Sequence, residues 1–121
     1  MNALCAEREL ESVLRWADDK LQDAESVAIS RHTRIEAAFD SIYARLLVLA
    51  RRAGHPQPSG HPSEHVILQG AVAAGLNDYC LNEVMELHLT VADHRYDPSA
   101  HTVSLPQALA LGHHLEKLVK G

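Results

Sequence analysis

Histidines are the residues of this chain whose type and spacing point most directly to chemistry. The sequence contains nine of them. His61 and His65 stand four positions apart, His55 belongs to the same stretch, and His113 and His114 are adjacent near the end of the chain. Imidazole nitrogens are common ligands of zinc and other transition metals. The pattern therefore suggests a metal site that includes His61 and His65, whereas two adjacent histidines on a helix point in different directions.

Other catalytic templates are weaker in this sequence. Glu64 and Glu116 can supply carboxylates to a histidine site, but no H-E-x-x-H or E-x-x-H helix pair accompanies them. The chain has no phosphate-binding glycine loop and no G-x-S-x-G elbow. Cys5 and Cys80 are far apart and form no C-x-x-C pair, which argues against a disulfide framework. We therefore predict no cofactor.

The charge balance bears on partners and location. With 11 basic and 16 acidic residues, the formal net charge is −5 at pH 7. Nucleic-acid binding depends on Lys and Arg neutralising phosphates, so only a local basic patch can support it here. Charged residues at positions 7 to 11 interrupt any signal-peptide run, and the apolar stretch 46–50 is too short to cross a bilayer. We expect a cytoplasmic protein that makes no membrane contact.

Length and composition predict the fold class. A chain of 121 residues is expected to form one domain, spanning residues 1–121. Hydrophobic residues make up 46% of the sequence but aromatic residues only 4%. A core of Ala, Leu, Val and Ile favours packed helices over a sheet. We therefore predict an all-α bundle.

The stretch from Thr33 to Gly54 is predicted to be the central helix. Its start is assigned to a capping box of Thr33 and Glu36, and its end to Arg51 and Arg52 followed by a left-handed Gly54. Apolar residues recur along it at steps of three and four, which places them on one helical face. They are Ile35, Ala38, Phe39, Ile42, Leu46, Leu49 and Ala50.

The remaining helices follow from similar start and stop signals. Apolar spacing over residues 3–29 indicates one long helix or two short ones, and we prefer a break at Asp18 and Asp19. A Pro- and Gly-containing loop covers residues 55–65. Later helices are predicted from near Ser63 to Gly75, from Asn77 to about His94, and from Ser104 to Gly121. Four to five helices with such connections favour an up-and-down bundle.

The predicted helix after Asn77 has apolar residues on more than one side. Leu87 and Leu89 are two positions apart and therefore lie about 200° apart around the helix axis. Both cannot face one core. A second apolar face commonly packs against another chain, so we predict a homodimer.

Three stretches carry a family resemblance: AAFDSIYARLLVLARRAGH at 37–55, GHPSEH at 60–65 and HRYDP at 94–98. This order of a central helix, a G-H turn, a histidine-containing loop and a Tyr-Asp pair resembles the HEPN class of helical bundles. It is most similar to the small bacterial HEPN-like proteins of uncertain function. The resemblance implies an all-α, HEPN-like bundle and extends over most of the chain after Ala28.

The resemblance also implies a candidate site. Active HEPN proteins are metal-independent ribonucleases that use an Arg and, after a short spacer, a His at a dimer interface. Arg95 and His101 meet this spacing, with Tyr96 and Asp97 as supporting residues. Such a His can take the proton of a ribose 2′-hydroxyl while the Arg stabilises charge on the phosphoryl oxygens. However, Tyr96 stands where a polar residue is expected and Pro98 interrupts the helix, so the motif is predicted to be degenerate.

These observations lead to three functional hypotheses. The first is a small cytoplasmic HEPN-like module that acts through protein or RNA interaction without catalysis. The second is a toxin-like, metal-independent endoribonuclease that uses Arg95 and His101, and the third is a histidine-rich metal-binding bundle. For some relatives the resemblance implies a nucleotidyltransferase or an antitoxin as the partner.

Overall fold

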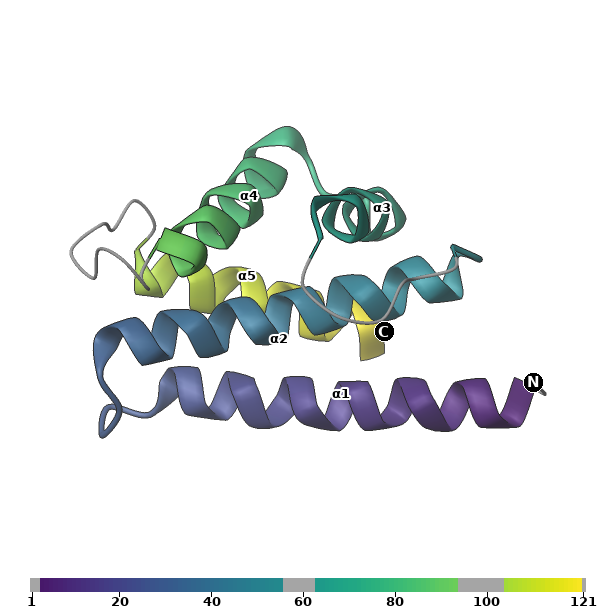
Figure 1. The fold of residues 1–121 in the computed structure, drawn as a ribbon, viewed down its shortest axis with the longest axis horizontal. Helices are drawn as coiled ribbons and strands as arrows, with labels where there is room; N and C mark the ends of the chain where they lie inside the picture. Colours follow the sequence, from purple (N-terminus) through teal and green to yellow (C-terminus); the bar gives the residue numbers. More distant parts are fainter. Residues whose placement is uncertain (1–2, 56–62, 94–103, 121) are drawn as a thin grey trace.

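The computed structural model describes residues 3–55, 63–93 and 104–120 of the chain. Within these ranges the regular structure is entirely helical (Figure 1), which confirms the predicted all-α class. None of the described helices is long and apolar enough to span a membrane. The helices are α1 (Ala3–Glu25), α2 (Arg31–Arg52), α3 (Glu64–Ala74), α4 (Asp78–Asp93) and α5 (Leu105–Lys120).

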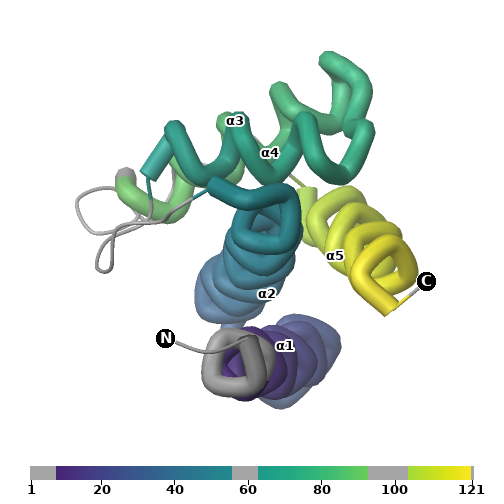
Figure 2. The backbone as a smooth tube through the Cα atoms, turned by 90° about the vertical axis from the view of Figure 1, so that its right-hand side faces the viewer, coloured from purple at the N-terminus to yellow at the C-terminus, as the bar shows by residue number. Residues whose placement is uncertain are grey.

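The central position of α2 is confirmed, because it packs against each of the other four helices. Helices α1 and α2 form an antiparallel hairpin, and α3 crosses above α2 at a steep angle (Figures 1 and 2). Helix α5 runs beside α2 in the same direction, and near their C-terminal ends Arg52 Nη1 donates to the Val119 carbonyl at 3.2 Å. The predicted up-and-down bundle has antiparallel neighbouring helices. The α1–α2 hairpin shows this arrangement, whereas α3 crosses α2 and α5 runs parallel to it.

Helix α1 is continuous, so the predicted break at Asp18 and Asp19 is wrong. The reason is tertiary. Ala17 and Leu21 are buried against the rest of the bundle, which requires the helical register to continue through this point. The Asp18 carboxylate accepts a hydrogen bond from Arg45 of α2, so it does not cap a new helix.

The start of α2 also differs from the prediction. The helix begins at Arg31 with Ser30 as its N-cap residue, so Thr33 lies inside the first turn and the Thr33–Glu36 capping box is wrong. The Ser30 hydroxyl donates to the Thr33 hydroxyl at 2.8 Å. Arg34 Nε donates to the Ala24 carbonyl at 2.8 Å, which ties the first turn of α2 to the last turn of α1.

The predicted C-terminal end of α2 is confirmed. Gly54 has a φ of 92°, in the left-handed region that favours glycine. The Gly54 and His55 amides donate to the carbonyls of Arg51 and Ala50, the hydrogen-bond pattern of a Schellman motif.

The start signals of α3, α4 and α5 are confirmed as well. Ser63 Oγ accepts from the Val66 amide at 3.2 Å, and Asn77 Oδ1 accepts from the Cys80 amide at 2.8 Å. For α5, Ser104 Oγ accepts from the Gln107 amide at 3.2 Å. In each case a side-chain oxygen satisfies an amide that has no partner within its own helix.

The core forms where the apolar faces of α2, α3, α4 and α5 meet. Phe39 is fully buried, and its ring centroid lies 6.0 Å from that of Tyr43 and 5.5 Å from that of His88. Leu87 is buried while Leu89 is 54% exposed, so the two faces predicted for α4 are confirmed. The homodimer itself remains a prediction.

Candidate functional site

The HEPN-type residues Arg95, Tyr96, Asp97 and His101 lie outside the described residues, so their arrangement remains a prediction. The same holds for His61. Its predicted metal-site partner His65 lies on the first turn of α3, is exposed, and has its Nε2 3.0 Å from the side-chain nitrogen of Gln69.

The described histidines do not converge on a metal site. Helix α3 begins at Glu64, so the spacing of His61 and His65 is not contained in one described helix. His113 contacts Glu25 of α1, whereas the adjacent His114 lines a groove between α4 and α5. Across residues 3–55, 63–93 and 104–120, no three His, Cys, Asp or Glu side chains are placed to hold a metal ion together.

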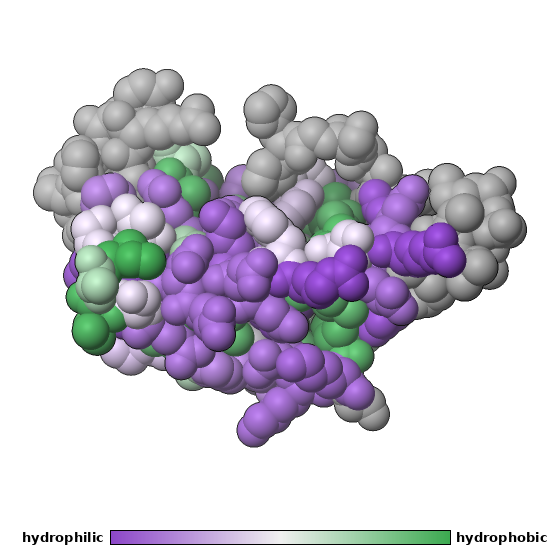
Figure 3. All heavy atoms as spheres, turned by 90° about the horizontal axis from the view of Figure 1, so that it is seen from below, coloured by the Kyte–Doolittle hydropathy of each residue, from purple (hydrophilic) through white to green (hydrophobic). Residues whose placement is uncertain are grey.

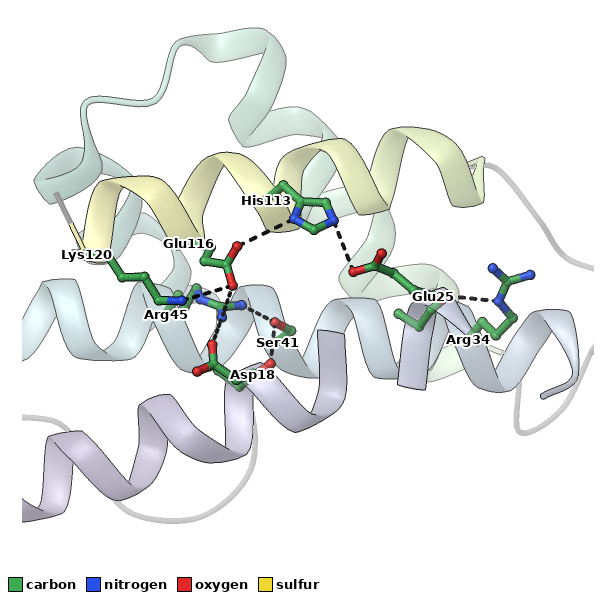
Figure 4. Close-up of polar contacts among 10 residues, drawn as sticks. Asp18, Glu25, Arg34, Ser41, Arg45, His113, Glu116 and Lys120 are labelled. Carbon is green, nitrogen blue, oxygen red and sulfur yellow. Dashed lines mark hydrogen bonds and ion pairs between the residues drawn. The ribbon is translucent and has the colours of Figure 1, made fainter. Parts of the chain in front are cut away.

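The structure instead brings polar residues together around Arg45. This side chain lies in the middle of α2, is 1% exposed, and is the largest of the fully buried side chains among the described residues. Its Nη2 donates to Asp18 Oδ1 of α1 at 2.5 Å and lies 3.6 Å from Glu116 Oε2 of α5 (Figure 4). Its Nη1 donates to the buried Ser41 hydroxyl, which donates to the Ala17 carbonyl at 2.8 Å.

Three further residues, Glu25 of α1 and His113 and Lys120 of α5, extend these contacts. His113 Nε2 lies 3.1 Å from Glu25 Oε1, and His113 Nδ1 lies 3.6 Å from Glu116 Oε1. Lys120 Nζ donates to Glu116 Oε2 at 3.3 Å. We call this set the Arg45 cluster; its members are Asp18, Glu25, Ser41, Arg45, His113, Glu116 and Lys120. Its polar contacts join α1, α2 and α5 (Figure 4).

Electrostatics explain why the cluster has this composition. A buried guanidinium is costly unless its charge is paired and its N–H groups are hydrogen-bonded. Asp18 and Glu116 supply opposite charges from two different helices, and the planar fork of the arginine reaches several acceptors at once. The charges of the cluster are thus paired with one another, as expected of ion pairs that fix how helices pack.

Glu116 shows the electrostatic balance within the cluster. Partial burial acts to raise the pKa of its carboxyl group, but this effect is outweighed. The hydrogen bond and charge of Lys120, the charge of Arg45 and the hydrogen bond of His113 together hold the pKa below its usual value. The folded state therefore favours the ionised carboxylate.

Replacing Glu116 with glutamine is expected to reduce the acid sensitivity of the fold. A carboxyl group with a lowered folded-state pKa stabilises the protein above its unfolded pKa of about 4.3. That contribution disappears as the pH falls through the lower folded-state pKa. Urea unfolding should therefore show the largest difference between wild type and Glu116→Gln at neutral pH and a smaller one near about pH 3. The exposed Glu11→Gln is the control, and a pH-independent difference for Glu116→Gln would contradict the expectation.

A groove of about 360 Å³ lies between α4 and α5. The hydrogen bond and charge of Glu83 raise the pKa of the exposed Tyr79 hydroxyl, and both residues line this groove. Cys80, which is half-buried, shares the groove with His114. The full lining consists of Tyr79, Cys80, Glu83, Gln107, Ala110, Leu111 and His114.

A second groove of about 360 Å³ follows the seam between α1 and α2. Trp16, the single tryptophan of the chain, lines this groove and is 45% exposed. Lys20 Nζ lies 5.4 Å from the Trp16 ring centroid, in cation–π range. The face of the molecule seen from the α1 side is mainly hydrophilic (Figure 3). The groove lining is Ser12, Val13, Trp16, Tyr43, Ala44 and Leu47.

Sequence reasoning missed Arg45, although a signal was present. Arg45 stands three positions after Ile42 and one before Leu46, so it interrupts the apolar face predicted for the central helix. A charged residue on such a face must find buried partners or disrupt the helix packing. Asp18 carries no such signal, because its partner Arg45 lies 27 positions away in the sequence.

Comparisons of the chain with protein-family models, curated proteins and solved structures give no match. The HEPN-like resemblance therefore stays a prediction.

Proposed function

We propose that this protein is a non-catalytic, HEPN-like interaction module that works in the cytoplasm as a homodimer and binds a protein partner. The observation that carries the proposal is the outer face of α3. The inner face of this helix packs on α2 through Val66, Ile67 and Gly70, all buried. On its outer face Leu68 is 46% exposed and Val72 is 81% exposed, one helical turn apart.

Apolar side chains paired in this way are typical of a surface that another protein covers. In an amphipathic-helix contact, residues four positions apart enter the same groove of the partner. The net charge of −5 favours a protein over RNA as that partner, because phosphate contacts require an excess of local positive charge. The HEPN-like resemblance suggests a nucleotidyltransferase or an antitoxin as its class.

Co-purification with matched variants tests the α3 surface. We expect a nucleotidyltransferase or antitoxin to co-purify with the wild type and to be lost with the double variant Leu68→Ser, Val72→Ser. Val27→Ser is the control, since Val27 is an exposed apolar residue in the turn between α1 and α2. Equal recovery of the same partner with the double variant would show that α3 is not the binding surface.

An RNA cleavage assay tests the absence of catalysis. The alternative function is a metal-independent ribonuclease that uses Arg95 and His101, whose sequence spacing fits that chemistry. We expect a labelled RNA pool to remain intact in EDTA across mildly acidic to mildly basic pH. Cleavage by the wild type that the double variant Arg95→Ala, His101→Ala loses would overturn the proposal and establish the ribonuclease.

A further inference from the structure

The α1–α2 hairpin has two long sides, and α5 covers one of them. The Arg45 cluster lies on the covered side, where Asp18 and Arg45 meet Glu116 of α5. Trp16 is two positions from Asp18, and Leu47 is two positions from Arg45, so each points about 200° around its helix from the covered side. Figure 2 shows α5 to one side of the hairpin, and the groove lined by Trp16 and Leu47 therefore lies on the other side.

An ion pair between α1 and α2 stands at each end of this groove. Glu9 Oε2 lies 3.8 Å from Arg51 Nη1 at one end, and Lys20 Nζ lies 3.8 Å from Asp40 Oδ2 at the other. Each helix has the same pattern, an acidic residue followed by a basic residue eleven positions later. The two ends are thus separated by about 16 Å, with the apolar lining between them.

We propose that this groove is the contact surface for a second copy of the same chain. A two-fold axis can lie in the contact plane either along the helices or across them. With the axis along the helices, Glu9 faces the partner's Arg51 and Lys20 faces the partner's Asp40. With the axis across them, Glu9 faces the partner's Lys20 and Arg51 faces the partner's Asp40. Both arrangements place opposite charges at the rim and bring the apolar linings together at the centre.

The residue types match those of protein interfaces. A half-exposed tryptophan that lines an apolar groove is the kind of side chain that dominates binding energy. Charged rims set the orientation of the two partners and disfavour wrong ones. Two hairpins joined in this way form a four-helix contact made from α1 and α2 of each copy. The inference rests on the homodimer of the proposed function and places the contact at this groove, away from Leu89 of α4.

Trp16 makes the contact directly measurable, because it is the single tryptophan of the chain. Light scattering and sedimentation should show a dimer at tens of micromolar that dissociates on dilution. Over the same concentration range, Trp16 emission should shift to longer wavelength and become more accessible to iodide quenching. A monomer throughout, or a dimer whose Trp16 emission and quenching do not follow its dissociation, would overturn the inference.

Two single variants locate the contact. Trp16→Ser should weaken dimerisation at least about tenfold, the effect expected of a central tryptophan, while far-UV circular dichroism stays unchanged. Leu89→Ser removes the exposed apolar residue of α4 and should leave the dimer intact. If Leu89→Ser weakened the dimer and Trp16→Ser did not, the homodimer would be supported but the groove would not be its contact surface. If the wild type is a monomer and the double variant Leu68→Ser, Val72→Ser still fails to bind the protein partner, self-association is rejected. The proposed role as an interaction module is then retained.

Charge-swap variants then distinguish the two axes and test the rim. The double variant Glu9→Lys, Arg51→Glu keeps opposite charges together within each copy. Between the copies it keeps opposite charges facing each other only when the axis lies along the helices. The double variant Glu9→Lys, Lys20→Glu keeps opposite charges facing each other between the copies only when the axis lies across the helices. One double variant should therefore dimerise like the wild type and the other should be weakened. Equal behaviour of both would contradict a contact at this rim.

Discussion

Replacing Arg45 with alanine is expected to lower the free energy of unfolding by about 2 to 5 kcal/mol, the cost typical of truncating a large buried side chain. The substitution removes the hydrogen bonds to Ser41 and Asp18 and leaves a cavity where α1, α2 and α5 meet. It also leaves the Asp18 and Glu116 carboxylates without their shared cation. Urea unfolding followed by circular dichroism measures the loss.

Two further substitutions separate charge from volume. Arg45→Met removes the charge but fills most of the space, so it leaves a smaller cavity and should cost less stability than Arg45→Ala. Arg31→Ala is the matched control, because Arg31 is an exposed arginine of the same helix and should change stability by less than about 0.5 kcal/mol. If Arg45→Ala were as mild as Arg31→Ala, the Arg45 cluster would not hold the three helices together.

Replacing Gly70 with alanine is the second change with a large expected effect. Gly70 lies where α3 crosses α2, and a Cβ atom added there would be 2.7 Å from Leu46 Cβ and 2.8 Å from the Leu46 carbonyl carbon. The backbone of a central helix cannot yield as a flexible side chain can. The two helices must therefore separate, at a cost of about 1 to 3 kcal/mol or more. Thermal unfolding by circular dichroism measures the effect.

Gly112 offers a matched control within α5. A Cβ added there would lie 3.1 Å from Leu21 Cδ1, the end of a flexible side chain. Alanine is also the better helix former by about 1 kcal/mol, so Gly112→Ala should be close to neutral or stabilising. Equal destabilisation by both substitutions would mean that the contact between α3 and α2 is looser than the structure indicates.

Local sequence signals predicted most helix boundaries correctly. Ser63, Asn77 and Ser104 accept amide hydrogen bonds at the starts of α3, α4 and α5, and Gly54 ends α2 in a left-handed conformation. These features depend on residues within a few positions of one another, so spacing alone can reveal them. The predicted break at Asp18 and the predicted start of α2 at Thr33 were wrong. At both places the structure has a contact between helices: Asp18 pairs with Arg45, and Arg34 of α2 donates to the end of α1.

The candidate site was harder to predict than the fold. The HEPN-type residues Arg95 and His101 lie outside the described part of the chain, and of the proposed metal pair only His65 lies within it. The Arg45 cluster was not predicted, because its members come from three helices that are distant in sequence. The charged residue on the apolar face of α2 was its visible sign.

By itself, the sequence determined the helical class, the apolar face of α2 and most caps. All of these follow from local hydrogen bonding and from the 3.6-residue period. Only the tertiary structure decided that α1 is continuous, that α5 runs parallel to α2, and that Gly70 permits α3 to cross α2 closely. It also decided which carboxylates pair with Arg45 and which side of the hairpin carries the groove lined by Trp16. The physical reason is that the partners of a buried charge and the occupant of a groove depend on which helices meet in space.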